Sequence, residues 1–378
     1  MKILVDENIP QAKEAFSKFG QVKLAHGRQI TNEMLLDIDA LIVRSITNVN
    51  EKLLHNTPVR FVGTATIGTD HIDKEYLKSK NIFFADAAGC NSFSVAEYVI
   101  TAITNIFYTI NKTFSGKRIG IVGYGNIGTK VARFAKALGF ETIINDPPLE
   151  RKYGKEKFGC LNDALDCDII TFHVPLNKIG IDKTYHLLNE ENIHLIKSGS
   201  LLINTSRGPV VDNSVLRKKL LEKKDLNVVL DVWENEPNID KELLQLTDIG
   251  TAHIAGYSLE GKLNGTFFVY EKLCKFLERN CEWTPDYPDI KESIIDINSS
   301  SEIEKILFEV TQKIYDITND SSQLKLLTNE DVVNPDKYFD QLRKNYHIRR
   351  EFNNYTIRTN EVNNKLKLLL QEMRFKVI

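Results

Sequence analysis

The sequence predicts an α/β protein in which parallel sheets are covered by helices. Short runs rich in valine, isoleucine and leucine alternate with helical stretches over residues 1–90, and a second such alternation begins near residue 118. Strands that alternate with helices are typical of parallel sheets with helices on their faces. The length of 378 residues favours two or three domains rather than one.

The first alternation is expected to form a sheet of its own. Four strands are predicted, and helical stretches at residues 10–20 and 32–39 separate the first two of them. A long apolar helix is expected next, at residues 92–110. The predicted strands are residues 2–6, 40–45, 59–65 and 82–87.

The second alternation is expected to form a larger parallel sheet, because several of its strands are continuous apolar runs, as strands covered on both faces should be. A helical stretch at residues 260–280 leads away from it. Residues 281–290 contain two prolines and no periodicity, which indicates a linker. The remainder of the chain shows helix signals and one strand candidate, residues 354–359. The predicted strands of the second sheet are residues 119–123, 141–146, 168–174, 200–206, 227–233 and 248–252.

Composition argues against several classes of protein. Hydrophobic residues make up 42% of the chain and the formal net charge is -2, so large cores are possible and no global positive field exists to hold nucleic acid or an acidic membrane. The apolar run before Asp6 is too short for a signal peptide, and no stretch approaches the roughly 18 apolar residues of a membrane span. The five cysteines form no CxxC pair, so we expect no disulfide framework, no metal site and a reducing cytoplasm.

A glycine-rich turn is the sharpest local signal. Gly123, Gly125 and Gly128 follow a predicted strand and open a predicted helix, with Asn126 and Ile127 between the last two glycines. In that context the glycines permit a tight turn, a close approach of the backbone to a pyrophosphate, and packing of the helix on the strand. The helix N-terminus offers free N–H groups to phosphates. The turn therefore predicts a dinucleotide site, although glycine-rich turns also occur without one.

Asp146 ends the next predicted strand. A carboxylate at this place can accept hydrogen bonds from the adenosine ribose and would repel a 2′-phosphate. Pro147 and Pro148 follow it, not the arginine that an NADP site would need. The sequence therefore predicts NAD as the cofactor.

Polar clusters follow three later strands, at the edge where α/β enzymes bind their ligands. Arg207, Glu236 and His253 are the chemically useful members of these clusters. Arginine grips a carboxylate with two parallel hydrogen bonds, histidine can take or return the proton of a hydroxyl, and a carboxylate behind the histidine holds its tautomer. Each residue alone also fits a structural role, namely a capping arginine, turn chemistry before Pro237, and a core histidine. Their order on successive strand ends favours oxidation of a 2-hydroxy acid.

The segments GIVGYGNIG, NTSRGPVVD, DVWENEP and HIAGY together resemble the D-isomer-specific 2-hydroxyacid dehydrogenase family, over roughly residues 1–280. The resemblance implies a Rossmann-type doubly wound domain at residues 93–256 that binds NAD. It implies that this domain is inserted in a smaller flavodoxin-like α/β substrate domain, made of residues 1–92 and 257–285. The implied activity is NAD-dependent oxidation at C2 of a small 2-hydroxy acid.

A closer likeness to one enzyme of this family extends into the tail. MKILVDENIP, VRSITNVNE, FVGTATIGTDHID, AGCNSFSVAEYV, HIAGYSLEGK and DQLRKNYHIRREF carry it. This likeness implies a C-terminal α+β dimerisation domain at residues 286–378, a homodimer, and a small phosphorylated 2-hydroxy acid as the substrate.

The resemblance also assigns roles to residues. Arg207 and Glu236 become active-site residues and His253 the proton donor and acceptor. Val174 stands where threonine is common, so a cofactor contact there must use the backbone. The implied substrate contacts are Ser45, Thr66 and Tyr257, and we add Arg44, which follows the apolar run ALIV and lies beside Ser45. The residues expected to bind NAD are Gly123, Gly125, Asn126, Ile127, Gly128, Asp146, Val174, Thr205, Ser206, Asp231 and Gly256.

Two questions stay open from the sequence. The first is the phosphate ligand: Arg44 is one candidate, and an arginine from the tail, reaching across a dimer, is another. The basic tail stretch equally fits a solvated helix face or dimer contacts. The second is the function, because another D-2-hydroxyacid dehydrogenase of phosphoglycerate or lactate type, or a NAD-sensing binding protein, would share this fold. The basic stretch consists of Arg343, Lys344, His347, Arg349 and Arg350.

Overall fold

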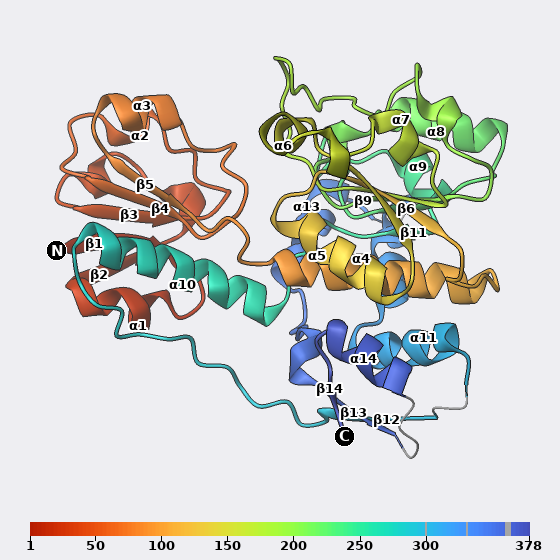
Figure 1. Cartoon of the computed structure of the whole chain (residues 1–378). Helices are drawn as coiled ribbons and strands as arrows, with labels where there is room; N and C mark the ends of the chain where they lie inside the picture. The colour runs from red at the N-terminus through yellow and green to blue at the C-terminus, as the bar shows by residue number, and fades with distance from the viewer. Residues whose placement is uncertain (299–300, 330–331, 360–363) are drawn as a thin grey trace. The chain divides into compact units, whose positions relative to one another are not determined.

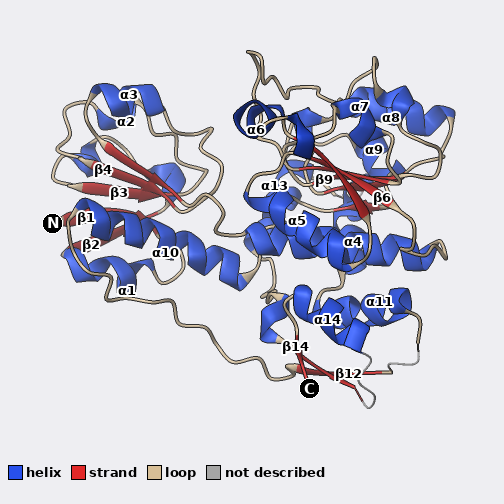
Figure 2. Cartoon of the chain, viewed as in Figure 1, coloured by secondary structure: helices blue, strands red, loops and turns tan. Residues whose placement is uncertain are grey.

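The chain folds into two compact units. The computed structural model describes residues 1–298, 301–329, 332–359 and 364–378. One unit contains Met1–Asn91 and Ser258–Asp289, and the other contains Ser92–Tyr257 and Ile290–Ile378. Figures 1 and 2 show both units: the first contains one sheet, and the second contains a large sheet and a small one. In the part of the chain that is described, no helix has the length and apolar character needed to cross a membrane.

The first unit holds a five-stranded parallel sheet in the order β2-β1-β3-β4-β5, which is the flavodoxin-like order. Four strands lie where the sequence predicts them. The fifth, β2, was not predicted, and the helix expected at residues 32–39 is only a short 3₁₀ turn at Glu33–Leu35. The strands are β1 (Lys2–Asp6), β2 (Gln21–Ala25), β3 (Ala40–Val43), β4 (Phe61–Thr64) and β5 (Phe83–Asp86).

Helices cover both faces of this sheet. Alternate strand residues point to opposite faces, so Ile3 and Ile42 lie in one apolar cluster with α1 and α10, whereas Leu4 and Leu41 lie in another with α2 and α3. Because α10 comes from the far end of the unit's sequence, it joins the two segments of the chain. The helices are α1 (Ala12–Phe16), α2 (Glu51–Leu54), α3 (Lys74–Ser79) and α10 (Leu259–Phe276).

The second unit holds a six-stranded parallel sheet in the order β11-β10-β9-β8-β6-β7. All six strands lie where the sequence predicts them. The chain runs from β6 to β7 on one side and then crosses to β8 on the other, so the strand order reverses at β6. Ligands of doubly wound sheets bind outside the carboxyl ends of the strands at such a reversal. The strands are β6 (Arg118–Val122), β7 (Glu141–Asn145), β8 (Ile169–Phe172), β9 (Leu201–Asn204), β10 (Asn227–Leu230) and β11 (Ile249–Gly250).

Two apolar clusters lie on the two faces of this sheet. Ile121 and Ile203 pack with α4 and α5, whereas Phe172 and Leu230 pack with α7, α8 and α9. The sheet is buried on both faces, as its continuous apolar strands predict. The helices are α4 (Ser92–Thr109), α5 (Asn126–Ala137), α6 (Pro147–Tyr153), α7 (Leu161–Leu165), α8 (Asn213–Glu222) and α9 (Lys241–Leu246).

The C-terminal segment of the second unit forms a three-stranded parallel sheet in the order β12-β13-β14. Its helices pack on the larger sheet's layers: α11 contacts α4, α14 contacts α5, and α12 contacts β11. Figure 1 shows α11 and α14 next to the layer that contains α4 and α5. This packing explains why α4 is buried on almost every side. The elements are β12 (Ile294–Ile297), α11 (Ile303–Ile314), α12 (Ile317–Lys325), α13 (Pro335–Lys344), β13 (Thr356–Thr359), α14 (Asn364–Glu372) and β14 (Lys376–Val377).

A buried ionic network fastens this segment to α4. Arg374 donates to Glu97 and to Glu351 at 2.8 Å each, and Ser94 donates to Glu351 at 2.9 Å. Burial and the neighbouring Glu351 raise the pKa of Glu97, and Arg374 only partly opposes them. Because a buried charge is tolerated only when it is paired and hydrogen-bonded, the network specifies where the C-terminal segment docks.

Candidate active site

The functional candidates of the second unit gather at one edge of the six-stranded sheet. The glycine-rich turn follows β6, Val174 follows β8, Arg207 follows β9, and His253 follows β11. All of these strands are parallel, so their carboxyl ends share one edge. The sequence prediction that these strand ends converge is therefore confirmed by the topology.

The glycine-rich turn has the shape of a pyrophosphate cradle. A Cβ atom on Gly128 would lie 2.0 Å from the carbonyl oxygen of Gly123, and one on Gly123, whose φ is +95°, would lie 2.7 Å from the backbone of His173. Both positions need glycine for close packing. A Cβ on Gly125 would meet nothing within 4 Å, so this residue faces open space. The open position is where a ligand can approach the backbone.

The start of α5 supplies donors to the same space. The first bond of this helix runs from the Thr129 N–H to the Gly125 carbonyl at 3.1 Å. The N–H groups of Asn126, Ile127 and Gly128 therefore precede the helical ladder, and they carry the positive end of the helix dipole. The glycine-rich turn, the N–H donors at the start of α5 and the reversal of strand order at β6 together form a site that suits the pyrophosphate of a dinucleotide.

Asp146 lies directly beside this cradle. One of its carboxylate oxygens accepts from the Tyr124 N–H at 2.8 Å, and the other accepts from the Leu149 N–H at 3.0 Å, which caps α6. These bonds fix the carboxylate at the end of β7. Each oxygen keeps further acceptor capacity, so a ribose hydroxyl can bond here.

His173 joins two of the strand ends behind the cradle. Its ring bonds the hydroxyl groups of Thr171 at 3.0 Å and Thr205 at 3.3 Å. Burial lowers the pKa of His173 to about 3, so this imidazole is neutral at physiological pH. Val174 follows it and is half-buried, whereas Thr205 and Ser206 are buried.

His253 and Glu236 form the chemically most informative contact. The Nδ1 atom of His253 lies 2.8 Å from Oε2 of Glu236, and the other carboxylate oxygen accepts from the Trp233 N–H at 2.8 Å. The His253 side chain is 33% exposed, so its face away from Glu236 remains accessible. Burial raises the pKa of Glu236, but the charge and hydrogen bond of His253 and the Trp233 N–H outweigh burial and hold it below its ordinary value. An ionised carboxylate thus orients an imidazole that can exchange protons.

Asp231 positions the loop that carries His253. One of its oxygens accepts from the Thr251 hydroxyl at 2.6 Å and the Ile254 N–H at 2.7 Å, and the other accepts from the Ala255 N–H at 2.9 Å. The Asp231 carbonyl also accepts from the His253 N–H at 2.7 Å. These bonds hold His253 at a left-handed φ of +56°, a conformation that a non-glycine residue keeps only when its surroundings enforce it.

Arg207 lies on a loop that touches the Glu236 loop. Its Nη1 donates to the Ser206 carbonyl at 2.8 Å, and the side chain is half-buried. A Cβ on Gly208 would lie 1.9 Å from the backbone of Trp233, so glycine is required for the two loops to meet. The close approach brings Arg207 to the same sheet edge as the Glu236–His253 pair.

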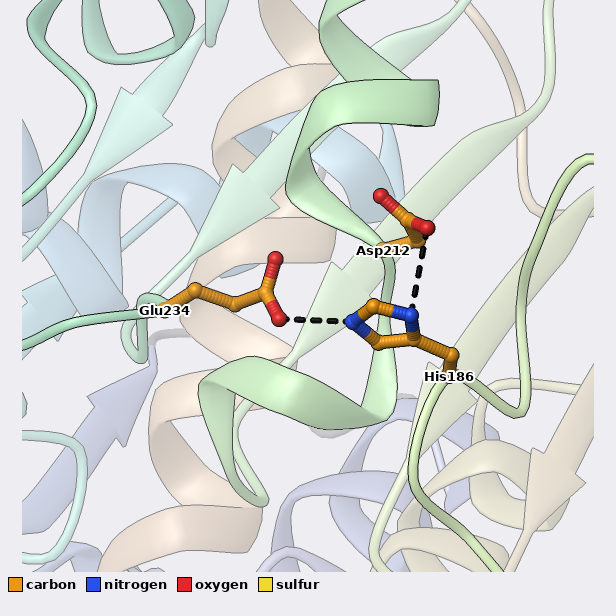
Figure 3. Close-up of side chains that lie close together, drawn as sticks. All are labelled: His186, Asp212 and Glu234. Atoms are coloured by element: carbon orange, nitrogen blue, oxygen red, sulfur yellow. Dashed lines mark hydrogen bonds and ion pairs between the residues drawn. The ribbon is translucent and has the colours of Figure 1, made fainter.

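Another histidine, which was not a candidate from the sequence, bridges the loop that carries Arg207 and the loop that carries Glu236. Figure 3 shows His186 between Asp212 and Glu234, at 3.2 Å and 2.7 Å from their carboxylate oxygens. Glu234 also accepts from the Asn213 N–H at 3.0 Å. Both ring nitrogens lie close to a carboxylate, so the imidazole bridges the two loops. One feature of the sequence indicates this cluster: Asp212 and Glu234 lie close in sequence to Arg207 and Glu236.

Tyr257 meets an arginine of the C-terminal segment. The Tyr257 hydroxyl accepts from Nη2 of Arg343 at 3.1 Å, and Gly256, beside it, is half-buried. Within the basic tail stretch, Arg349 and Arg350 are buried, while Lys344 and His347 are exposed. A solvated helix face therefore describes only part of that stretch.

The remaining candidates lie in the first unit. Arg44 and Ser45 follow β3, and Thr66 follows β4, the neighbouring parallel strand. The Thr66 hydroxyl bonds that of Thr64 at 2.8 Å, and His71 bonds the same Thr64 hydroxyl at 3.0 Å. Burial lowers the pKa of His71 to about 4 although Asp70 opposes it, so a neutral His71 braces this loop.

Comparison with known proteins agrees with this geometry. The NAD binding domain of the D-isomer specific 2-hydroxyacid dehydrogenases matches residues 104–255, and a domain of unknown function matches residues 288–372. Solved structures share the fold: D-lactate dehydrogenase of Aquifex aeolicus, complexed with NAD and lactic acid, has a TM-score of 0.58 at 24% identity over 74% of this chain and 96% of its own. The NAD-bound 3-phosphoglycerate dehydrogenase of Entamoeba histolytica has a TM-score of 0.62 at 23% identity over 76% and 99%.

Curated relatives show which group of enzymes within this family the chain resembles in sequence and length. Erythronate-4-phosphate dehydrogenase of Proteus mirabilis is 43% identical, with 94% of each chain covered. That of Salmonella arizonae is 40% identical over 100% of this chain and 99% of the relative. The chain therefore belongs to the D-isomer-specific 2-hydroxyacid dehydrogenase family and, within it, to the erythronate-4-phosphate dehydrogenases.

Replacing His253 by alanine should raise the pKa of Glu236. The substitution removes the largest contribution that opposes burial, so the buried carboxylate should hold its proton to higher pH. In the wild-type protein the depressed pKa stabilises the fold above the pKa of the unfolded chain, and this stabilisation is lost as the pH falls through the folded-state value. A titration of ¹³C-labelled glutamate carboxyls by NMR over about pH 3 to 7 measures the shift.

The matched control for this titration is His186→Ala. His186 contacts Glu234 on the same loop but forms no bond with Glu236, so this variant should leave the Glu236 titration unchanged. A Glu236 titration that is identical in wild type and His253→Ala would show that the pair does not form in solution.

Proposed function

We propose that the chain catalyses NAD-dependent oxidation of 4-phospho-D-erythronate to 2-oxo-3-hydroxy-4-phosphobutanoate, in the biosynthesis of pyridoxal 5′-phosphate (vitamin B6). The observation that carries the proposal is the Glu236–His253 pair at 2.8 Å, on the sheet edge that also bears the dinucleotide cradle. The names of the relatives at 40–43% identity supply the substrate. Geometry alone supports only a small 2-hydroxy acid.

His253 is the proton acceptor of this mechanism. Its Nε2 takes the proton of the C2 hydroxyl while the C2–H bond breaks and the carbonyl forms. NAD, when bound, accepts the hydride that leaves C2. Glu236 stabilises the imidazolium through Nδ1, and Arg207 binds the substrate carboxylate and polarises the forming carbonyl with its fixed charge. In the reverse direction His253 returns the proton.

The remaining assignments are part of the same proposal. Backbone at the glycine-rich turn binds the pyrophosphate, and Asp146 binds the adenosine ribose. Val174 contributes backbone contacts, and Arg44, Ser45, Thr66 and Tyr257 bind the substrate. Support comes from their places at strand ends and from the family resemblance. The other proposed NAD contacts are Thr205, Ser206, Asp231 and Gly256.

We further propose a three-domain enzyme that acts as a homodimer in the cytoplasm. In this proposal residues 1–92 and 257–285 bind the substrate, residues 93–256 bind NAD, and residues 286–378 dimerise. The proposal is supported by the separate sheet of β12, β13 and β14 and by free cysteines at all five positions, which suit a reducing compartment.

A direct test is the change in nicotinamide absorbance when candidate acids are added to the protein and NAD. We expect turnover of 4-phosphoerythronate, with much lower kcat/KM for erythronate and 3-phosphoglycerate. His253→Ala should lower kcat about 10²- to 10⁴-fold, the usual contribution of a general base. His194→Ala changes an exposed histidine that has no role in the proposed mechanism and should retain wild-type kcat.

Two results would contradict the proposal. Higher kcat/KM for 3-phosphoglycerate or lactate would place the chain with another activity of the family. An absence of turnover with every acid, together with measurable NAD binding, would favour a NAD-sensing protein that has kept the fold.

Cofactor choice provides a separate test. Asp146→Ala should reduce kcat/KM for NAD and narrow the preference for NAD over NADP, because it removes a ribose acceptor and a charge that repels the 2′-phosphate. The ratio of kcat/KM with the two cofactors is the readout. Asp182→Ala, at an exposed ion pair with Arg151, is the control and should leave the ratio unchanged. An equal ratio in wild type and Asp146→Ala would mean that Asp146 does not face the ribose.

A further inference from the structure

Arg343 is a half-buried cation whose charge acts on Glu236 of the Glu236–His253 pair. It lies in the last turn of α13, and its Nη2 donates to the Tyr257 hydroxyl at 3.1 Å. Its Nε atom is buried and has no hydrogen-bond partner. Glu236 and Arg343 are near enough for the arginine charge to help lower the pKa of the Glu236 carboxyl, after the larger effects of burial, His253 and Trp233.

The charge of Arg343 is not neutralised by a direct ion pair. Within residues 1–298, 301–329, 332–359 and 364–378, no carboxylate lies within 4.0 Å of its guanidinium, and Glu236 and Asp340 act on it only from a greater distance. Arg374 of the same C-terminal segment, by contrast, pairs with two carboxylates at 2.8 Å. Withdrawing even part of a cation from water without a paired anion has a free-energy cost. A site that keeps such a cation beside its reactive histidine is suited to an anionic ligand.

The segment that carries Arg343 is anchored firmly enough to position it. Phe339 of the same helix is fully buried in the apolar cluster of the second unit, and Tyr346 donates to Asp320 at 2.8 Å. The rings of Tyr346 and Tyr257 meet edge-on at 5.9 Å. Arg349 donates to the carbonyl of Ala255, two residues after His253. The C-terminal segment and the His253 loop therefore form one connected structure within a single chain.

We propose that Arg343 binds the phosphate group of the substrate, in the same chain that supplies His253. The inference rests on the proposed function, in which Arg207 already holds the carboxylate. A substrate with two anionic ends needs a second cation, and the planar guanidinium can donate two parallel bonds to phosphate oxygens. Tyr257, through its bond to Arg343, orients the guanidinium toward the ligand. In this proposal the C-terminal segment determines substrate specificity, in addition to any role that it has in dimer contacts.

The experiment compares Arg343→Gln with wild type on 4-phosphoerythronate and on unphosphorylated erythronate. We expect kcat/KM for the phosphorylated acid to fall about 10- to 100-fold, mainly through KM, as loss of a charge-assisted hydrogen bond predicts. The value for erythronate should stay within about twofold, because that substrate has no group for Arg343 to bind. Inorganic phosphate should inhibit the wild type competitively against the acid, and Arg343→Gln should weaken that inhibition by a similar factor.

Two further variants keep the test interpretable. Lys344→Gln removes an exposed charge from the adjacent position of α13 and should change neither substrate's kcat/KM. Arg343→Lys keeps the charge but loses the planar fork, and should retain part of the phosphate preference. Thermal unfolding of each variant shows whether the fold is intact, and if Arg343→Gln is unfolded, the Lys variant and phosphate inhibition decide the question.

Equal losses for both acids, with unchanged phosphate inhibition, would overturn the proposal, because they would assign Arg343 to tuning the Glu236–His253 pair. If the proposed function itself were wrong, the experiment would give a different result. In that case the wild type would not oxidise 4-phosphoerythronate at all, while stabilisation by inorganic phosphate in thermal unfolding would still depend on Arg343. If that stabilisation were also independent of Arg343, the anion site itself would be disproved.

Discussion

The buried carboxylate of Asp231 is the interaction on which the candidate active site depends. Its side chain is 1% exposed, and it accepts hydrogen bonds from Thr251, Ile254 and Ala255. A buried charge needs such a set of donors, and one loop of the chain supplies all of them. Satisfying Asp231 therefore forces the loop into the conformation that presents His253 to Glu236. The Glu236–His253 contact therefore depends on the hydrogen bonds that satisfy the buried Asp231 carboxylate at the end of the neighbouring strand.

The C-terminal segment also holds this loop in place, through hydrogen bonds to residues that follow His253. Arg349 is buried, bonds the Ala255 carbonyl, and lies with its guanidinium 4.6 Å from the centre of the Tyr315 ring. Arg343 bonds Tyr257, two residues further along. The loop of residues 253–257 is thus bonded to β10 through Asp231 and to the tail through two arginines. A chain that lacked the tail would lose these supports, which links the tail to substrate binding by a physical route.

Much of the fold could be predicted from the sequence because its signals are local. Several strands of the larger sheet are continuous apolar runs, and Gly123 and Gly128 of the glycine-rich turn each have a steric reason. Strand β2 was missed because Gln21–Ala25 is an edge strand with mostly exposed residues, and Lys23 separates Val22 from Leu24, so it lacks the continuous apolar run of a buried strand. The His186 bridge and the place of Arg343 could not be predicted, because each joins residues far apart in the sequence. Arg207, Glu236 and His253 could be proposed together from the sequence because the carboxyl ends of parallel strands share one edge of a sheet.

The most direct test of the account is a double-mutant cycle of Asp231→Asn and His253→Ala, measured as kcat. If Asp231 acts by positioning the His253 loop, Asp231→Asn should lower kcat substantially in the wild-type background and have little further effect when His253 is already alanine, because coupled groups are not additive. Binding of NAD, measured in parallel, separates this role from a direct cofactor contact. The same fold-loss of kcat in both backgrounds would contradict the account, since it would show that Asp231 contributes independently of the histidine it is thought to position.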